Sequence, residues 1–457
     1  MALVTLQTIF QDAFPAYEAL HPLPAHVRKA ARAIMQCRTA ALGGHVQACP
    51  DGHVSRIWYN SCRHRSCPQC AYLQTERWLA LQRARLLACD HYHVIFTLPH
   101  DLNPLWLANV QVMTTLLFQA VRDTLCTLLA DPRYLGAQPG ILAALHTWSQ
   151  TLVLHPHVHC LVTGGGLPPD GQWKAVRQGF LLPARVVMAV FRGKMLEAIR
   201  QADAREALVL PEGMRPQPFL NLLGRLGHPC KTPWNVRIME RYRHGAGVVT
   251  YLARYLRGGP LKNARLVAYD GACVTFTYRA RQEEADAGPA SPPRMTLPVA
   301  DFLQRWLLHV PVPQTRVVRC YGLYHPTHAE ALTICRTAFG QPPMEAPPAL
   351  DWQTVCAQRG DRIRNGVPPA VSCSCVPASS RVAVRHHPYG LRSARHEADS
   401  RQAAGREQPG VWSVWRWPSG VPARAGTRSG GRSGPGLHTA TPQGRLAGLV
   451  AGGRAWG

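Results

Sequence analysis

The sequence predicts an α+β fold with a metal-binding segment near its N-terminus and a disordered tail at its C-terminus. Three observations predict it. β-forming runs and amphipathic helical runs are interspersed between about residues 70 and 330. Cysteines and histidines crowd together within residues 37–70. After about residue 340 the hydrophobic periodicity disappears, and Gly, Pro, Ser, Ala and Arg dominate.

Composition limits the class of protein. The chain has 457 residues, which suggests two or three domains, and 46% of them are apolar, enough for a sizeable core. Lys and Arg number 51 against 26 Asp and Glu, so the formal charge is +25. A chain this basic is typical of proteins that bind polyanions such as nucleic acids.

The sequence favours a reducing, cytoplasmic compartment. Its 15 cysteines are too clustered and irregular for a secreted disulfide framework, and Met1–Thr5 does not begin a signal peptide. The longest apolar run, 105–130, is interrupted by polar residues and is expected to form an amphipathic helix, not a membrane span. We therefore expect no membrane partner.

Changes in composition divide the chain into four predicted parts. These are a helical arm (1–36), a zinc-binding domain (37–75), a main α+β domain (76–335) and an Arg/Gly/Pro-rich tail (336–457). Within the tail, residues 371–457 hold 12 Arg and 3 acidic residues, so they contribute +9 of the net charge. Such a segment lacks the apolar residues needed for a core and is expected to be disordered.

Periodicity predicts the elements of the main domain in order. Helices are expected at 72–90, 105–130, 183–203, 248–257 and 299–309. Strands are expected at 93–98, in a pair within 141–163, in a hairpin at 264–279 and at 316–322. Within 164–235, the segments on either side of the helix 183–203 are rich in Pro and Gly and are expected to form loops.

A cysteine pair carries the zinc prediction. Cys67 and Cys70 enclose Pro-Gln in a C-x-x-C turn, which lets two thiolates bind one tetrahedral Zn²⁺. The other ligands must come from upstream, where Cys49 and His53 have the best spacing and Cys62 is a close rival. The alternative is a set of reduced, buried cysteines. A redox role is less favoured, because no βαβ pattern surrounds the pair.

Three histidines at alternate positions suggest a second metal site. His155, His157 and His159 lie in a predicted strand, 151–163, that three glycines are expected to end. Alternate side chains of a strand share one face, about 7 Å apart, so neighbouring imidazoles can converge on one divalent ion. A histidine-rich edge strand without metal is the alternative.

Two tyrosines lie one helical turn apart. Tyr251 and Tyr255 are at i and i+4 in the predicted helix 248–257, so they share a face. Such a pair usually packs in a core or forms a half-exposed stripe. Spacing alone therefore does not make them nucleophiles.

In this order, the motifs resemble those of a known family, the two-tyrosine HUH transposases of rolling-circle insertion sequences, of the IS91 type. The resemblance covers roughly residues 10 to 330. It rests on Asn-Ser-Cys-Arg-His-Arg-Ser-Cys-Pro-Gln-Cys at 60–70, His-Pro-His-Val-His-Cys-Leu-Val at 155–162, Tyr-Leu-Ala-Arg-Tyr at 251–255 and, more weakly, Arg-Cys-Tyr-Gly at 319–322.

The resemblance implies both a fold and a chemistry. The catalytic domain, 76–335, would hold an antiparallel sheet flanked by helices. His157 and His159 would bind Mg²⁺ or Mn²⁺, with His155 a candidate third ligand, and Tyr251 and Tyr255 would be the nucleophiles. The substrates would be single-stranded DNA, transposon ends and target DNA, and the bound protein would associate with the bacterial nucleoid.

The chain departs from this family in two places. Relatives often have a C-x-x-C where this chain has only Cys49 before the Gly-His dipeptide that contains His53. The cysteines at 356, 373 and 375 form a different pattern from the C-terminal cysteine segment of relatives. The resemblance therefore leaves the zinc ligand set open.

Basic residues near the motifs are candidates for DNA binding. Arg63 and Arg65 lie in the zinc segment, and Arg254 and Arg257 flank the tyrosines. Two other functions fit the same motifs. One is a zinc-ribbon DNA-binding protein without catalysis, and the other is a nuclease that depends on a histidine-bound metal.

Overall fold

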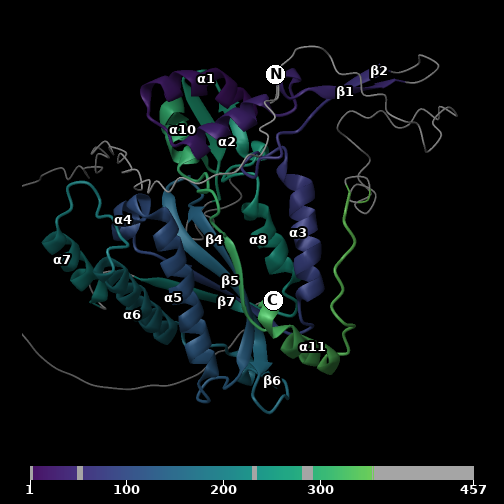
Figure 1. The fold of residues 1–457 in the computed structure, drawn as a ribbon, viewed down its shortest axis with the longest axis vertical. Coiled ribbons are helices and arrows are strands. Elements are labelled where there is room, and N and C mark those ends of the chain that lie inside the picture. The colour runs from purple at the N-terminus through teal and green to yellow at the C-terminus, as the bar shows by residue number, and fades with distance from the viewer. Residues whose placement is uncertain (1–3, 49–54, 229–233, 280–291, 352–353, 355–457) are drawn as a thin grey trace, which may run out of the picture. The chain divides into compact units, whose positions relative to one another are not determined.

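A six-stranded antiparallel sheet organises the fold (Figure 1). The computed structural model describes residues 4–48, 55–228, 234–279, 292–351 and 354. The strand order is β11-β4-β5-β3-β7, and β6 pairs with the far end of β5. The strands are β3 His91–Thr97, β4 Gln138–Trp148, β5 Leu154–Leu167, β6 Lys174–Ala175, β7 Asn235–Tyr242 and β11 Val318–Gly322. The predicted α+β class with an antiparallel sheet flanked by helices is confirmed.

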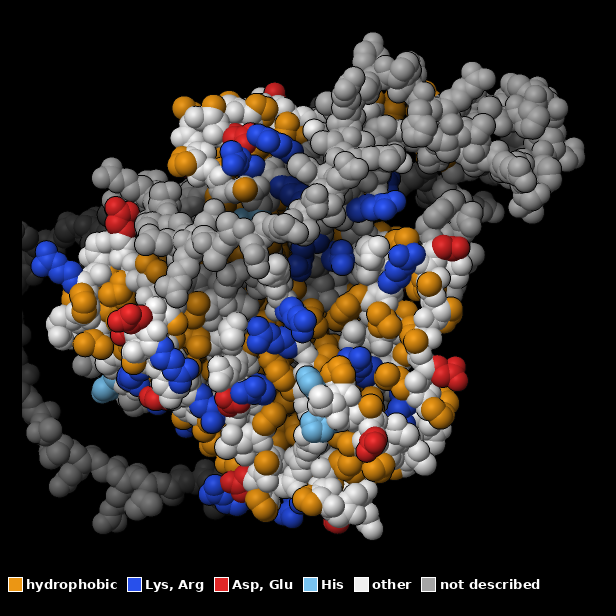
Figure 2. Space-filling model, in the orientation of Figure 1, with side chains coloured by type: hydrophobic (Ala, Val, Ile, Leu, Met, Phe, Trp, Pro, Cys, Tyr) orange, Lys and Arg blue, Asp and Glu red, His pale blue; other side chains and the backbone are white. Residues whose placement is uncertain are grey.

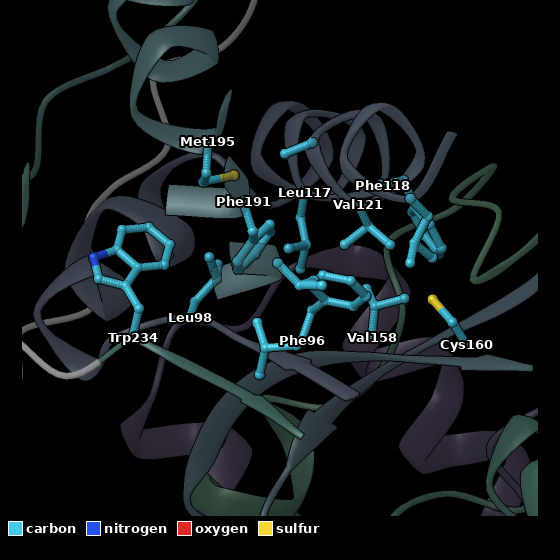
Figure 3. Close-up of a cluster of buried hydrophobic side chains, with 14 of the residues drawn as sticks. Phe96, Leu98, Leu117, Phe118, Val121, Val158, Cys160, Phe191, Met195 and Trp234 are labelled. Carbon is cyan, nitrogen blue, oxygen red and sulfur yellow. The ribbon is translucent and has the colours of Figure 1, made fainter. Parts of the chain in front are cut away.

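One face of the sheet carries the main hydrophobic core. Four helices cover it: α4 Asn103–Ala108, α5 Val110–Ala130, α6 Ala184–Ala204 and α7 Pro216–Gly227. Figure 3 shows Val158 and Cys160 of β5 pointing from the sheet toward Leu117 and Val121 of α5. These side chains are fully buried, and each removes apolar surface from water.

The opposite face of the sheet holds a smaller core. The helices there are α3 Ala71–Arg85, α8 Ala246–Leu256 and α11 Ala329–Ala338. Leu161 of β5 packs with Val249 and Leu252 of α8 in this core. β5 therefore alternates, as predicted, between the two faces, and the α8 face is the one that its histidines share.

The N-terminal helices pack on a second, three-stranded sheet. The elements are α1 Leu6–Leu20, α2 Ala25–Gln36, β8 Leu266–Tyr269, β9 Cys273–Thr277, β10 Arg294–Pro298 and α10 Val299–Leu307, with sheet order β10-β9-β8. Phe10 meets Trp306 edge to face, with ring centroids 5.0 Å apart. The backbone N–H of Leu6 donates to Oδ1 of Asn263 at 3.1 Å. The arm therefore folds together with a segment more than 250 residues away in sequence.

A two-stranded ribbon follows α2. Its strands are β1 Gly44–Ala48 and β2 Ser55–Tyr59, paired antiparallel from Gly44 with Tyr59 to Ala48 with Ser55. The short 3₁₀ helices of the described chain lie at Ala40–Leu42, His100–Leu102, Arg177–Gly179, Asn263–Arg265 and Pro326–His328.

The predicted helix 105–130 is two helices that meet at Asn109. This residue leaves the helical conformation, with φ −139° and ψ 44°. Its side chain accepts from Val209 N at 2.8 Å and donates to Val209 O at 2.7 Å, so it holds a loop and breaks the helix. Among the described residues, α5 is the one helix with the length and composition to cross a membrane, but more than half of its apolar window is buried inside the protein.

The prediction that the glycines at 164–166 end the central strand is wrong. β5 continues through them to Leu167 and pairs there with β6. The glycines allow a close approach of backbones, because a Cβ on Gly165 would lie 2.5 Å from the carbonyl oxygen of Lys174 and 2.6 Å from Cζ2 of Trp173.

One helix, α7, lies where the sequence predicted a loop, and a strand, β7, follows it in a segment for which the sequence predicted no element. α7 begins at Pro216, which is suited to the first helical turn because its missing N–H has no intrahelical acceptor there. Its amphipathic face buries Phe219, and β7 follows after Trp234, whose indole N–H donates to Leu226 O at 2.9 Å.

The four-part division of the chain stays a prediction. Part of the predicted tail is described, and Nε of Arg77 on α3 donates to Leu350 O at 2.6 Å. Residues 355–457 lie outside the described residues.

Substituting Gly165 tests the close approach of β5 and β6. We expect Gly165→Ala to lower the midpoint of thermal unfolding by about 2–12 °C, because overpacking costs about 1–3 kcal/mol and each kcal/mol shifts a domain of this size by about 2–4 °C. Gly193→Ala on α6 is the control, since nothing lies within 4 Å of its added Cβ, and it should leave the midpoint unchanged or raise it. Equal midpoints for Gly165→Ala and the unaltered chain would contradict this account.

Candidate functional site

Three histidines from two adjacent strands converge on the α8 face of the sheet. His146 of β4 stands opposite His157 of β5 in the strand register, and His159 is the next β5 residue on the same face. One ring nitrogen from each lies within 4.8 Å of the others. We call these three residues the histidine triad. His146 and His159 are buried, and His157 is largely buried.

Hydrogen bonds orient two rings of the triad. Nδ1 of His157 donates to the carbonyl oxygen of His155 at 2.6 Å. Nδ1 of His159 is hydrogen-bonded to Nε2 of His93 on β3 at 2.8 Å. Both hydrogen bonds use Nδ1, so Nε2 of each ring remains available to bind a metal ion. A hydrogen bond to the other ring nitrogen commonly orients a histidine that binds a metal.

Burial keeps the triad uncharged. It lowers the pKa of His157 to about 4 and holds the pKa values of His146 and His159 well below the ordinary value of 6.5. The positive charges of neighbouring rings would act in the same direction. Neutral imidazoles are the form that binds a metal ion.

His155 is a neighbour of His157 but does not belong to the group of converging nitrogens. Its Nδ1 is 3.1 Å from Nε2 of His100, in an exposed pair beside His157. The third nitrogen of the converging group comes from His146, which sequence analysis did not single out. The signal for His146 was weak, because a single histidine in an apolar strand becomes informative only once the register with β5 is known.

Tyr251 lies beside the triad. It projects from α8, and its ring centroid is 5.7 Å from that of His159 and 6.0 Å from that of His93. Its ring is partly buried against the small core. Tyr255 follows one turn later on α8, but its side chain lies outside the described residues.

Four cysteines form a second converging group. The sulfur atoms of Cys37, Cys62, Cys67 and Cys70 lie within 4.8 Å of one another. The Sγ of Cys70 is 3.2 Å from that of Cys37 and 3.5 Å from that of Cys62. Four thiolates around one Zn²⁺ at about 2.3 Å stand about 3.8 Å apart, so the donor set and its spacing fit structural zinc. We call this group the cysteine cluster.

The cysteine cluster connects two helices. Cys37 caps the C-terminus of α2, and Cys70 caps the N-terminus of α3. Of the predicted ligands, Cys62, Cys67 and Cys70 are brought together, whereas Cys49 and His53 lie outside the described residues. Sequence spacing missed Cys37, since it is 25 positions before Cys62.

Hydrogen bonds within the cluster raise the pKa values of Cys62 and Cys67 and lower those of Cys37 and Cys70, so two of the four thiols favour the thiolate. A hydrogen bond from the Cys62 thiol, the largest cause, lowers the pKa of Cys37 to about 7. Hydrogen bonds from Cys37 and its neighbours also hold the pKa of Cys70 below its ordinary range. Thiolates are the ligands that Zn²⁺ takes.

The predicted DNA-binding arginines lie near the end of α8 and the cysteine cluster. Arg63 is exposed, and Arg65 and Arg257 are partly buried. Burial and then the charge of Arg257 lower the pKa of Arg65, so the two guanidinium groups are close. The side chain of Arg254 lies outside the described residues. Figure 2 shows Lys and Arg side chains gathered across the middle of the face that carries α3 and α8.

The parts of the chain that hold the histidine triad and the cysteine cluster both match known protein families. A family model described as "Putative transposase" matches residues 140–331, and one described as "Transposase zinc-binding domain" matches residues 9–98. The first range contains the histidine triad and both tyrosines, and the second contains the cysteine cluster.

Two curated proteins are similar over most of the folded region. "Putative transposase y4qJ" of Sinorhizobium fredii is 38% identical over 336 residues, which cover 73% of this chain and 83% of that protein. "Transposase for insertion sequence element IS801" of Pseudomonas savastanoi pv. phaseolicola is 29% identical over 306 residues, which cover 63% and 68%. No solved structure gives a significant match.

Zinc content tests the membership of Cys37 in the cluster. The purified full chain should contain about one zinc per molecule by elemental analysis. Cys37→Ser should lower that content several-fold, because it removes one of four thiolates. Cys273→Ser, on β9 and outside the cluster, should retain the metal. A Cys37→Ser protein that holds zinc as tightly as the unaltered chain would show that another residue completes the site.

Metal affinity tests the role of His93. His93→Phe keeps a ring but removes the hydrogen bond to His159, so Mn²⁺ affinity measured by calorimetry should fall about 10–100-fold. His91→Phe is the matched control, because His91 is a buried histidine of the same strand that bonds to the Tyr324 hydroxyl at 2.7 Å instead. Equal affinities for the two variants would contradict the orienting role.

Proposed function

Because the chain belongs to the IS91-type transposases, which carry an N-terminal zinc-binding domain, we propose that it cuts and rejoins single-stranded DNA through 5′-phosphotyrosine intermediates. The observation that carries the proposal is the position of Tyr251 beside the histidine triad, with its ring 5.7 Å from that of His159. A nucleophile and a metal-binding group side by side on one sheet face are what phosphoryl transfer to a tyrosine requires.

The strand cut follows from these positions. The hydroxyl oxygen of Tyr251 attacks the scissile phosphorus, a Tyr–O–P bond forms, and the bond from phosphorus to the 3′-oxygen breaks. The phenolic proton is released, and the 3′-oxygen gains a proton to become a free hydroxyl. The phosphotyrosine ester keeps the energy of the broken bond, so attack by another 3′-hydroxyl rejoins DNA without ATP.

A free tyrosine is a weak nucleophile at neutral pH, because its pKa is near 10. A divalent cation held by the triad would supply positive charge for the phosphate and the departing oxygen. Three imidazole nitrogens suit Mn²⁺ better than Mg²⁺, which prefers oxygen ligands, although phosphate and water oxygens could complete either ion. The donor set therefore fits the expected ion, with His146 in the place proposed for His155.

Two tyrosines would divide the work of strand transfer. Tyr255 lies one turn after Tyr251 on the same helix. One tyrosine would hold a cut strand end while the other attacks a second strand, as rolling-circle transposition requires. The end held first would then be passed to the 3′-hydroxyl released by the second cut.

Charge and flexibility favour single-stranded DNA as the substrate. An unpaired backbone can bend to bring its phosphorus into line with a tyrosine fixed on a helix. Arg63, Arg65, Arg254 and Arg257 would bind neighbouring phosphates, at transposon ends and at the target. The protein would act in the bacterial cytoplasm and associate with the nucleoid.

An SDS-resistant adduct tests the nucleophiles. The probe is a set of single-stranded oligonucleotides that tile the DNA flanking the gene, incubated with the full chain and Mn²⁺. Tyr251→Phe/Tyr255→Phe loses both hydroxyls and keeps both rings, so it should fold normally and form no adduct. His157→Ala should lose Mn²⁺ affinity and slow adduct formation at least about 100-fold, with DNA binding retained. Tyr278→Phe is the control and should react as the unaltered chain does.

The outcomes distinguish the candidate functions. An adduct formed by the double Phe variant would exclude these tyrosines as nucleophiles. Cutting without an adduct would support a histidine-dependent nuclease. Binding without cutting would support a zinc-ribbon DNA-binding protein. A single Phe variant that still transposes would show that one tyrosine suffices.

A further inference from the structure

The helix that carries the tyrosines ends directly against the cysteine cluster. α8 ends at Leu256, and two glycines follow with φ of 89° at Gly258 and 70° at Gly259. The backbone N–H of Gly258 donates to the carbonyl oxygen of Arg65 at 2.7 Å, two residues before Cys67. The turn after α8 is therefore hydrogen-bonded to the loop that leads into the C-x-x-C turn.

This contact leaves no room for side chains at the turn. A Cβ on Gly258 would collide with Nζ of Lys262 and would lie 3.0 Å from Cβ of Ala71 and 3.3 Å from Cα of Pro68. Pro68 lies inside the C-x-x-C turn. The positive φ at Gly258 further restricts the position to glycine. The backbone after α8 thus lies directly on the C-x-x-C turn.

Lys262 fills the space between the two parts. Its Nζ donates to the carbonyl oxygen of Arg257, the C-cap residue of α8, at 2.6 Å. A cation at a helix C-terminus is favoured by the helix dipole. Burial lowers the pKa of Lys262 to about 8, and a thiolate at the nearby Cys67 acts in the opposite direction. Four thiolates around Zn²⁺ carry a net charge of about −2, so a loaded cluster would hold this lysine in place.

A second connection runs along α3. Cys70 is the N-cap residue of this helix, and Leu79 of the helix packs with Val249 and Leu252 of α8 in the small core. Near the other end of α3, Nη2 of Arg83 donates to Oγ1 of Thr250 at 3.2 Å. The cysteine cluster therefore contacts the tyrosine helix at its end and supports a helix that packs along its side.

We propose that Lys262 is a positioning residue: it ties the end of α8 to the cysteine cluster, so that zinc binding fixes the placement of Tyr251 beside the histidine triad. This inference rests on the proposed function for its kinetic consequence. Lys262 touches neither DNA nor the triad in this account. Its loss should therefore slow the chemical step and leave substrate binding and Mn²⁺ binding in place.

The test compares Lys262→Met with Lys194→Met in the full chain. Met keeps the length of the lysine stem and removes its charge, and Lys194 lies on α6, away from both metal groups. For Lys262→Met the rate of adduct formation at saturating oligonucleotide should fall about 10–100-fold, since a misplacement of about 1 Å can cost 100-fold. Oligonucleotide affinity, Mn²⁺ affinity and zinc content should stay within about twofold of the unaltered chain. Lys194→Met should change none of these quantities.

Two further measurements keep the proposal decisive. Lys262→Gln keeps a donor that can reach the Arg257 carbonyl oxygen, so its rate should lie between those of Lys262→Met and the unaltered chain. Hydrogen exchange of residues 246–256 should quicken in Lys262→Met, because the helix end loses its anchor. This readout does not depend on DNA cleavage.

The remaining outcomes contradict either the role of Lys262 or the proposed function on which it rests. An unaltered adduct rate in a zinc-loaded Lys262→Met protein overturns the proposal. Loss of zinc from both Lys262 variants also overturns it, since Lys262 would then serve the folding of the cluster. If the unaltered chain forms no adduct with any oligonucleotide, the proposed function fails, and the exchange of α8 alone decides whether Lys262 positions the helix.

Discussion

Side-chain alternation along β5 is the constraint on which the rest of the structure depends. One strand supplies both a fully apolar core and a polar site, because Val158 and Cys160 point to one face and His157 and His159 to the other. The apolar face gives the burial that holds the sheet against α5 and α6. That burial fixes the register of β4 and β5, and the register places His146 opposite His157. A slip of one residue would exchange the two faces and destroy core and site together.

The two groups of metal-binding side chains suit different tasks. Four thiolates would make a closed, soft site for Zn²⁺ that ties α2 to α3. Three imidazoles leave coordination positions open for phosphate and water oxygens. α8 lies between the two groups, with Tyr251 beside the triad and its C-terminal turn against the cysteine cluster. We infer that the cysteine cluster maintains the position of α8, and that Tyr251 of α8 acts together with the histidine triad.

Local patterns predicted much of the structure from the sequence, and long-range contacts account for the rest. The α+β class, the helix of the tyrosines, the hairpin at 264–279 and the shared face of His157 and His159 follow from periodicity of 2.0 or 3.6 residues. His146 and Cys37 were missed because each joins its group through strand pairing or helix packing, which spacing does not reveal. α7 was missed because its prolines, which suit the first turn of a helix, were expected to mark a loop. The glycines of β5 suggested the end of the strand, because glycines often mark turns. In the structure they are required by the close approach of the β6 backbone, which local sequence does not reveal.

Burial of the histidines also ties the fold to acidity. It lowers the pKa of His93 and His157 to about 4, and the pKa values of His146 and His159 lie well below 6.5. At a pH between the folded pKa and the ordinary value of 6.5, these histidines would be protonated in the unfolded chain but neutral in the folded chain. Stability from these rings is therefore complete above about pH 6.5 and is lost as the pH falls toward 4, by on the order of 3 kcal/mol each for His93 and His157. Acid therefore acts directly on the α8 face of the sheet in the metal-free protein.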